Sequence, residues 1–251
     1  MNPQLENARY FLKDNVRQRV DFSQTDQRRH IPPPPIELPF SRDARRIPLK
    51  KIDQLVTIGT IDLKNAIANR ESRRDYLNEP LTLDELSFLL WATQGVRLKL
   101  DAGHALRTVP SAGCRHAIET RLCVLNIDGM EPGIYRYLPL EHELLFEQSP
   151  EKLNMKIVEA SLGQRFTGEA AVVFVWTTIP YRMEWRYGIA AHKVIALDAG
   201  HVCQNLYLAC EAVRAGTCAI AAYDQQAMDS LLGVDGVEEF TIYLASVGRK
   251  G

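Results

Sequence analysis

Residues 170–177 read Ala-Ala-Val-Val-Phe-Val-Trp-Thr, a continuous apolar run of the length of one β-strand. A strand without polar alternation is typical of a sheet that is covered on both faces. From about residue 189 to 214, apolar residues recur at spacings of three and four, which predicts one long helix with a single buried stripe. The residues of that stripe are Ile195, Ala199, Val202, Leu206, Ala209 and Val213. The apolar strand and the long helix together predict that helices pack on a sheet.

The other periodic segments alternate loosely between helices and strands. Thr82-Leu83-Asp84-Glu85 is a capping-box pattern, which predicts a helix from there to Gly95. Gly216 is expected to end the long helix. Further helices are expected around 63–67, 151–162 and 224–232, and strands at 118–127, 133–137, 143–146, 218–223 and 240–247. This order predicts the α+β class, with a mixed or antiparallel sheet sandwiched by helices.

Residues 1–59 are predicted to be an extension of a compact domain that spans residues 60–251. Residues 5–20 could form a short amphipathic helix. Pro32-Pro33-Pro34-Pro35 predicts an extended polyproline segment, because each proline ring fixes φ and lacks an amide donor. A solvated arm is the favoured interpretation, and an arm that lies across a second subunit is the alternative.

Composition excludes several classes of protein. The formal net charge of −1 over 251 residues argues against general binding to nucleic acid or to anionic membranes. No apolar stretch approaches the roughly 18 residues that span a bilayer, and the N-terminus does not read as a signal peptide. The five cysteines form no Cys-x-x-Cys pair, so neither a zinc site nor a disulfide framework is expected. No metal is expected, and a cytoplasmic location fits best.

Three short segments carry candidate chemistry. Residues 70–74 (Arg-Glu-Ser-Arg-Arg) offer guanidiniums and a hydroxyl that can converge on a phosphate, although a solvated helix end is the alternative. Residues 110–116 and 216–224 are rich in small side chains, which let backbone amides approach a flat ligand closely. An ordinary loop and a tightly packed core strand are the alternatives for these two segments.

Together these segments resemble the nitroreductase superfamily, in particular its SagB-type dehydrogenase branch. The resemblance runs from about residue 60 to the C-terminus. It is carried by SRRDY (72–76), PSAGCRHAIE (110–119), GIYRYLPLEHEL (133–144), DAGHVCQNLYLACEA (198–212) and GTCAIAAYD (216–224). It implies a nitroreductase-like fold, FMN as cofactor, and a homodimer in which each flavin site is shared between subunits.

The resemblance also implies roles for single residues. Arg70 and Ser72 would contact the phosphate of FMN, and Arg74 would lie near the pyrimidine edge of the flavin. Arg73, at the odd position, would point to solvent. Arg249 would be a further phosphate ligand.

Two more segments receive roles in the same way. The turn Pro110, Ser111, Ala112 and Gly113 would be lent to the flavin by the second subunit. Ala221 and Ala222 would present a backbone amide to flavin N5. The family often has glycine at the second of these positions, so Ala222 is a departure that keeps the amide.

Azoline oxidases of this branch carry a Lys-Tyr pair that is linked to proton transfer. Arg186-Tyr187 stands at the matching place. A guanidinium cannot act as a base, which puts azoline oxidation in doubt, and Arg186 could instead steer an anionic substrate. Asp198 and His201, three residues apart on the long helix, are expected to belong to a satisfied hydrogen-bond network.

The favoured function is therefore an FMN-dependent oxidoreductase. It would pass hydride through flavin N5 between a donor such as NADH or NADPH and a small organic acceptor. The alternatives are oxidation of a peptide-derived azoline, a flavin-binding or flavin-fragmenting protein, and a non-catalytic dimerisation module.

Overall fold

A computed structural model describes residues 2–251 of the chain. Its centre is a seven-stranded sheet in the order β1-β6-β5-β4-β7-β9-β8, and each neighbouring pair is antiparallel. The strands are β1 (Arg46–Pro48), β4 (Ile118–Val124), β5 (Gly133–Leu138), β6 (Glu143–Gln148), β7 (Val172–Thr178), β8 (Ala215–Ile220) and β9 (Phe240–Arg249). A separate hairpin pairs β2 (Val96–Lys99) with β3 (Ala105–Arg107). The predicted α+β class with an antiparallel sheet is confirmed.

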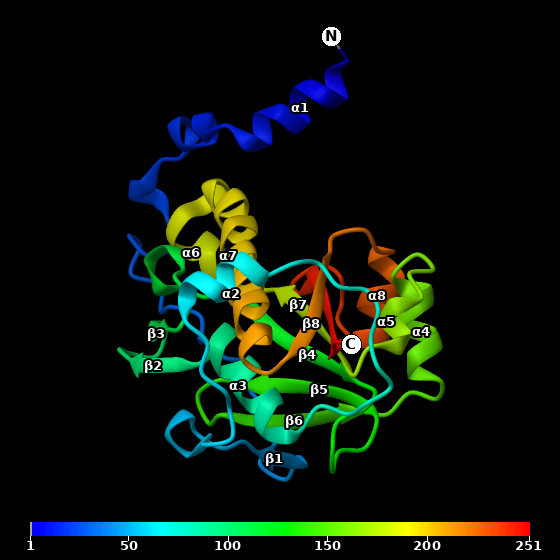
Figure 1. Cartoon of the computed structure of the whole chain (residues 1–251). Coiled ribbons are helices and arrows are strands. Elements are labelled where there is room, and N and C mark those ends of the chain that lie inside the picture. Colours follow the sequence, from blue (N-terminus) through cyan, green and yellow to red (C-terminus); the bar gives the residue numbers. More distant parts are fainter. Residues whose placement is uncertain (1) are drawn as a thin grey trace.

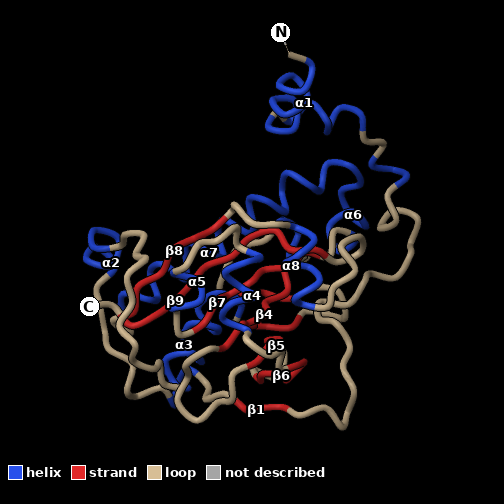
Figure 2. Tube along the Cα trace, turned by 90° about the vertical axis from the view of Figure 1, so that its right-hand side faces the viewer, coloured by secondary structure: helices blue, strands red, loops and turns tan. Residues whose placement is uncertain are grey.

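Helices cover both faces of this sheet (Figures 1 and 2). On one face lie α3 (Leu83–Gln94) and α7 (Ala191–Ala212), with α2 (Leu63–Asn69) and α6 (Tyr181–Tyr187) packed against α7. On the other face lie α4 (Leu153–Ala160) and α8 (Gln225–Leu232), with α5 (Phe166–Glu169) beside α4. No helix within residues 2–251 is long and apolar enough to cross a membrane.

The central strand β7 is buried along its whole length. Side chains alternate across a strand, so one set of residues faces each helical layer. Phe174 and Trp176 belong to the core cluster that contains α3 and α7, whereas Val173 and Val175 belong to the cluster that contains α4 and α8. The apolar run at 170–177 is therefore the strand covered on both faces that its composition predicts.

Helix α7 buries the whole predicted stripe, from Ile195 to Val213. It does not end at Gly216, so that prediction is wrong. Arg214 adopts φ 52°, in the left-handed region, and turns the chain directly into β8. Gly216 lies inside β8, where a Cβ would come within 2.9 Å of the Arg73 Cβ. Gly216 allows Arg73 to pack closely on the strand and does not end the helix.

The N-terminal extension is not a solvated arm beyond its first helices, so that interpretation is wrong for residues 24–49. Strand β1 joins the sheet beside β6, and the proline segment packs on the body. Prolines lack amide donors but keep their carbonyls, and buried arginines bond these oxygens. Arg115 Nη2 donates to Pro34 O at 3.3 Å, and Arg136 Nη2 donates to Pro39 O at 3.1 Å. Helix α1 (Pro3–Leu12), which buries no residue, stands clear of the body (Figure 1).

Glu37 fastens the extension to the loop between β5 and β6. Its carboxylate oxygen Oε2 accepts a hydrogen bond from the Leu140 amide at 3.1 Å. Burial raises the pKa of Glu37 to about 8, against an ordinary value of 4.5, and the nearby carboxylates of Glu141 and Glu119 add to the shift. A carboxyl with a raised pKa holds more protons in the folded state than in the unfolded state. The contribution of Glu37 to stability must therefore fall as the pH rises from about 4.5 through 8.

This contribution predicts how Glu37→Gln behaves. The amide keeps an acceptor for Leu140 but does not ionise, so the variant should be equal to the wild type near pH 5. By pH 8.5 it should be more stable by roughly 1–3 kcal/mol. Urea unfolding at several pH values measures the difference, with Glu151→Gln, at an exposed position, as the control. A constant gap between Glu37→Gln and wild type across this range would contradict the prediction.

Candidate functional site

The segment 70–74 runs along the edge strand β8. Helix α2 ends at Asn69, and the chain then extends, so that Ser72 forms a parallel bridge with Thr217. The Arg73 amide donates to Thr217 O at 3.0 Å. Ser72 and Arg74 are exposed and Arg70 is half-buried. Pairing with the sheet edge thus fixes the backbone while these side chains stay accessible.

Tyr207 of α7 joins this segment to β8. Its hydroxyl lies 2.8 Å from Ser72 Oγ and accepts a hydrogen bond from the Ala219 amide at 2.9 Å. The Arg70 guanidinium carbon lies 5.2 Å from the centroid of the Tyr207 ring, within the range of a cation–π contact. Arg70, Ser72 and β8 are therefore gathered around one buried tyrosine.

The other end of this group lies where β8 ends. Ala221 and Ala222 follow the strand and are exposed. Gln164 Nε2 donates to Ala222 O at 2.8 Å, which fixes the peptide on that side. Arg74 lies over the Phe166 ring at 5.8 Å, and its charge partly offsets the burial that raises the pKa of Cys218 in β8. The structure thus brings two of the predicted segments, 70–74 and 216–224, to one edge of the sheet.

The turn at Pro110–Gly113 packs against α6. Gly113 has φ 61°, and a Cβ there would lie 2.7 Å from Tyr187 Oη and 2.9 Å from Arg186 Nε. Only a residue without a side chain fits this approach in this conformation. The predicted turn and the predicted Arg186-Tyr187 pair are therefore in contact within one chain.

Asp198 of α7 supports the same turn. The Ser111 hydroxyl, the Ala112 amide and His201, 4.0 Å away, each favour the ionised carboxylate, yet burial dominates and raises the pKa of Asp198. Its Oδ2 is buried and has no hydrogen-bond partner among residues 2–251. The expected network at Asp198 and His201 is therefore not fully satisfied.

The two groups of residues lie apart. Asp198 holds the turn and Tyr207 holds the 70–74 segment, nine positions further along α7. At 1.5 Å of rise per residue, this spacing is about 14 Å along the helix axis. A single chain thus presents these two groups of residues at different levels of α7.

Two predicted arginines have other partners. Arg249 makes a two-pronged ion pair with Glu85, at 2.9 and 2.8 Å, and the same two terminal nitrogens also donate to the carbonyls of Val213 and Pro80. Both terminal nitrogens are thus already engaged by protein groups. Arg73 does not point freely to solvent, because it packs on Gly216 and pairs with Glu71 at 2.7 Å.

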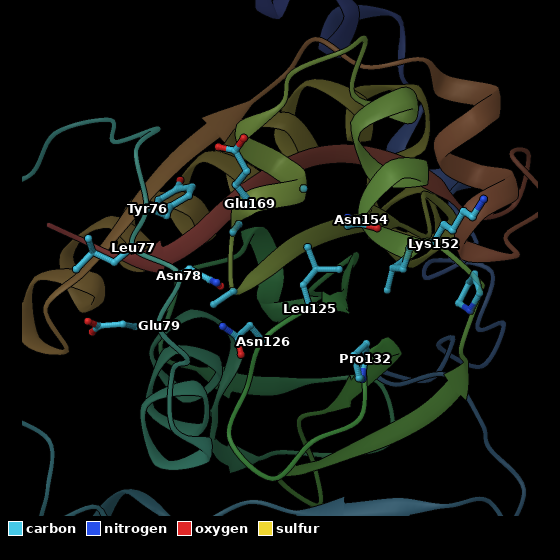
Figure 3. Close-up of a pocket in the computed structure, with 15 residues that line it drawn as sticks. Tyr76, Leu77, Asn78, Glu79, Leu125, Asn126, Pro132, Lys152, Asn154 and Glu169 are labelled. Carbon is cyan, nitrogen blue, oxygen red and sulfur yellow. The ribbon is translucent and has the colours of Figure 1, made fainter.

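A cavity of about 690 Å³ lies elsewhere, between residues 76–79, the end of β4 and the start of α4. Figure 3 shows Asn78, Glu79, Lys152 and Glu169 around it. None of the predicted site residues lines this cavity. Within residues 2–251, no group of three or more His, Cys, Asp or Glu side chains is arranged to hold a metal ion.

The model of the nitroreductase family matches residues 67–249. The chain belongs to the nitroreductase family. It is 32% identical over 197 residues to MJ1384 of Methanocaldococcus jannaschii, which is named as a candidate nitroreductase; the match covers 78% of this chain and 96% of that one. A solved nitroreductase-type structure from Ralstonia eutropha matches with a TM-score of 0.68 and 26% identity, covering 88% of this chain and 99% of that one.

A third relative in the comparisons is the Trifolitoxin-processing protein TfxB of Rhizobium leguminosarum bv. trifolii. It is 26% identical over 227 residues, which is 86% of this chain but only 60% of TfxB. The chain thus spans less than two thirds of this relative.

Sequence reasoning did not single out Tyr207 or Phe166. Tyr207 lies beside the buried stripe of α7, where a buried tyrosine must find partners for its hydroxyl. That requirement was the available signal, but its partners, Ser72 and Ala219, follow only from the fold. Phe166 lies in a four-residue helix whose sequence carries no comparable signal.

The contact of the turn with α6 is testable by Gly113→Ala, with Gly129→Ala as the matched control. Both glycines have positive φ, so both variants carry the same backbone strain, but a Cβ at Gly129 meets nothing within 4 Å. Gly113→Ala must also displace Tyr187 and Arg186, which should cost about 1 kcal/mol more in unfolding free energy. Denaturant unfolding of the two variants measures this, and equal losses would show that the turn does not pack on α6.

Proposed function

We propose that this chain is an FMN-dependent oxidoreductase that works as a homodimer. The observation that carries the proposal is the gathering of Arg70 and Ser72 around Tyr207, on the strand that ends at the exposed peptides of Ala221 and Ala222. When bound, FMN supplies reversible hydride exchange at its N5 atom. The family membership supports redox chemistry of this general kind.

The residues at the sheet edge fit FMN. Arg70 offers a planar cation and Ser72 an exposed hydroxyl, the donor types that hold a phosphate. Arg74 would lie toward the pyrimidine edge, where a cation stabilises the negative charge of a reduced flavin. The exposed peptides at Ala221 and Ala222 leave room for a flat ring, with Ala222 in place of the family's frequent glycine. Arg249 has no part in this proposal, because its donors are engaged by Glu85.

Two chains would complete the site. The turn at 110–113 and the 70–74 segment are about 14 Å apart along α7, so a second chain would bring its turn to the first chain's sheet edge. Four large apolar residues on α2, α7 and the turn before α7 are more than half exposed, which is typical of a covered interface. They are Leu63, Ile67, Ile189 and Leu197. A Cβ at Gly200 of α7 would meet nothing, so the helix surface there is free for close approach.

The proposed reaction takes electrons from NADH, NADPH or a similar donor and passes them to a small organic acceptor. Arg186, which faces the turn with Tyr187, would attract an anionic group of the substrate. The five cysteines of the chain are free thiols, which fits a reducing cytoplasm as the proposed location.

A second candidate is oxidation of a peptide-derived azoline, as in SagB-type dehydrogenases. The similarity to a trifolitoxin-processing protein favours it. Such a reaction removes a proton from carbon as hydride leaves, and Arg186 cannot accept that proton. Tyr187, whose hydroxyl lies at the 110–113 turn, is the member of the pair that can exchange a proton, and it would accept this one in its tyrosinate form.

The leading proposal predicts bound flavin and a phosphate contact. The purified protein, after incubation with FMN, should show flavin absorbance at one FMN per chain, and light scattering should give twice the chain mass. Arg70→Ala should weaken FMN binding by roughly 2–5 kcal/mol, because a phosphate charge loses its partner. Arg73→Ala should weaken it less, and Arg42→Ala, exposed just before β1 at the opposite edge of the sheet, should leave it unchanged.

Three outcomes would count against this prediction. Absence of flavin bands after loading would contradict the cofactor. A stable monomer that holds FMN would exclude the shared site. Equal losses of FMN affinity at Arg70 and Arg73 would mean that the assignment of the phosphate contact to Arg70 is wrong.

Tyr187→Phe distinguishes the two candidate reactions. If the enzyme is a reductase, the kcat with a quinone acceptor should stay within about tenfold, because hydride transfer needs no side-chain base. If it desaturates a heterocycle, the loss should be on the order of 10²–10⁴, the usual worth of a positioned acid or base. We expect the first result, with FMN occupancy verified in both proteins. A drop beyond about a hundredfold would favour the second candidate.

A further inference from the structure

Tyr207 occupies the centre of the sheet-edge group but exposes only 8% of its surface. Its hydroxyl has two neighbours, Ser72 Oγ at 2.8 Å and the Ala219 amide at 2.9 Å. The first belongs to the segment after α2 and the second to β8, so the tyrosine connects two elements that are far apart in sequence.

The hydrogen atoms at this junction can be assigned by counting donors. The Ala219 amide donates to the tyrosine oxygen, which leaves the single Tyr207 hydrogen for Ser72 Oγ, the other partner that the structure gives it. The opposite arrangement, with Ser72 donating, would leave a buried hydroxyl hydrogen without an acceptor, which is costly. In the favoured arrangement the Ser72 hydrogen is free. Because Ser72 is exposed, that hydrogen is directed to whatever lies outside the sheet edge.

Arg70 is restrained by the same side chain. Its guanidinium lies 5.2 Å from the ring centroid, and no ion pair of Arg70 with a carboxylate is found among residues 2–251. A cation that rests on an aromatic face keeps its N–H groups for another acceptor. Tyr207 therefore presents one hydroxyl donor and one cation outward, and both favour an anion.

We propose that Tyr207 is a positioning residue for the phosphate end of the cofactor. Its hydroxyl sets the hydrogen direction of Ser72, and its ring holds Arg70 beside it. This inference rests on the proposed function, since it concerns how this chain's residues receive the phosphate.

The test is a double-mutant cycle on FMN affinity. Tyr207→Phe keeps the ring and Arg70 but removes the hydroxyl, and Ser72→Ala removes its partner. Each should raise the Kd for FMN about tenfold, the worth of one hydrogen bond to a charged group. The double variant should be no weaker than either single variant, because both act through the same hydrogen bond. Additive losses would overturn the proposal.

Riboflavin separates positioning from general damage. It lacks the phosphate, so Tyr207→Phe should change its Kd by less than about twofold, and equal losses for FMN and riboflavin would also overturn the proposal. Tyr135→Phe, which removes a tyrosine hydroxyl bonded to Glu131 O at 2.8 Å in β5, is the control and should leave the FMN affinity unchanged. If wild-type protein fails to bind FMN at all, the proposed function falls. If wild type binds and the cycle is additive, only the role of Tyr207 falls.

Discussion

Burial of β7 on both faces is the constraint that organises this molecule. An unbroken apolar strand can be shielded from water only if a layer of side chains covers each face, and here Phe174 and Trp176 meet α3 and α7 while Val173 and Val175 meet α4 and α8. The 22-residue α7 supplies most of one layer. Because α7 is fixed along its length, the polar groups on its flanks are held at fixed positions as well. Asp198 and Tyr207 are two such groups: the first lies at the 110–113 turn and the second at the 70–74 segment.

The regular elements follow from the sequence because their signals are local. The residues that make the Thr82 capping box and the apolar stripe of α7 lie within a few positions of one another in the sequence. Both features are formed as predicted. Periodicity alone could not show which stripe is covered: Leu63 and Ile67 of α2 share a helical stripe yet lie exposed, whereas Ile195 lies buried. Exposure of that kind depends on which other elements pack beside the helix, and the helix's own sequence does not encode them.

The candidate site was predictable in its segments but not in its partners. Residues 70–74 and 221–222 converge at one sheet edge because Ser72 pairs with β8, a long-range bridge that no local pattern encodes. Arg249 and Arg73 show the limit most clearly. By residue type alone, any arginine can bind a phosphate. In the structure, however, the Arg249 guanidinium pairs with Glu85, and the Arg73 side chain packs on Gly216. Which arginine is free for an anion is decided by distant residues.

The N-terminal extension contacts the elements that hold the 110–113 turn, and these contacts are also long-range. A proline run lacks amide donors, but backbone carbonyls in and just after it accept hydrogen bonds from buried arginines. Arg115 bonds Pro34 O, Arg107 bonds Ile36 O and Arg136 bonds Pro39 O. The same extension holds α6: the Gln27 amide donates to Trp185 O, and Trp185 Nε1 donates to Ile31 O, each at 2.9 Å. Helix α6 carries Tyr187, which packs at Gly113. The extension therefore helps to fix the 110–113 turn, and its anchoring residues, Glu37 among them, belong to the scaffold of the site.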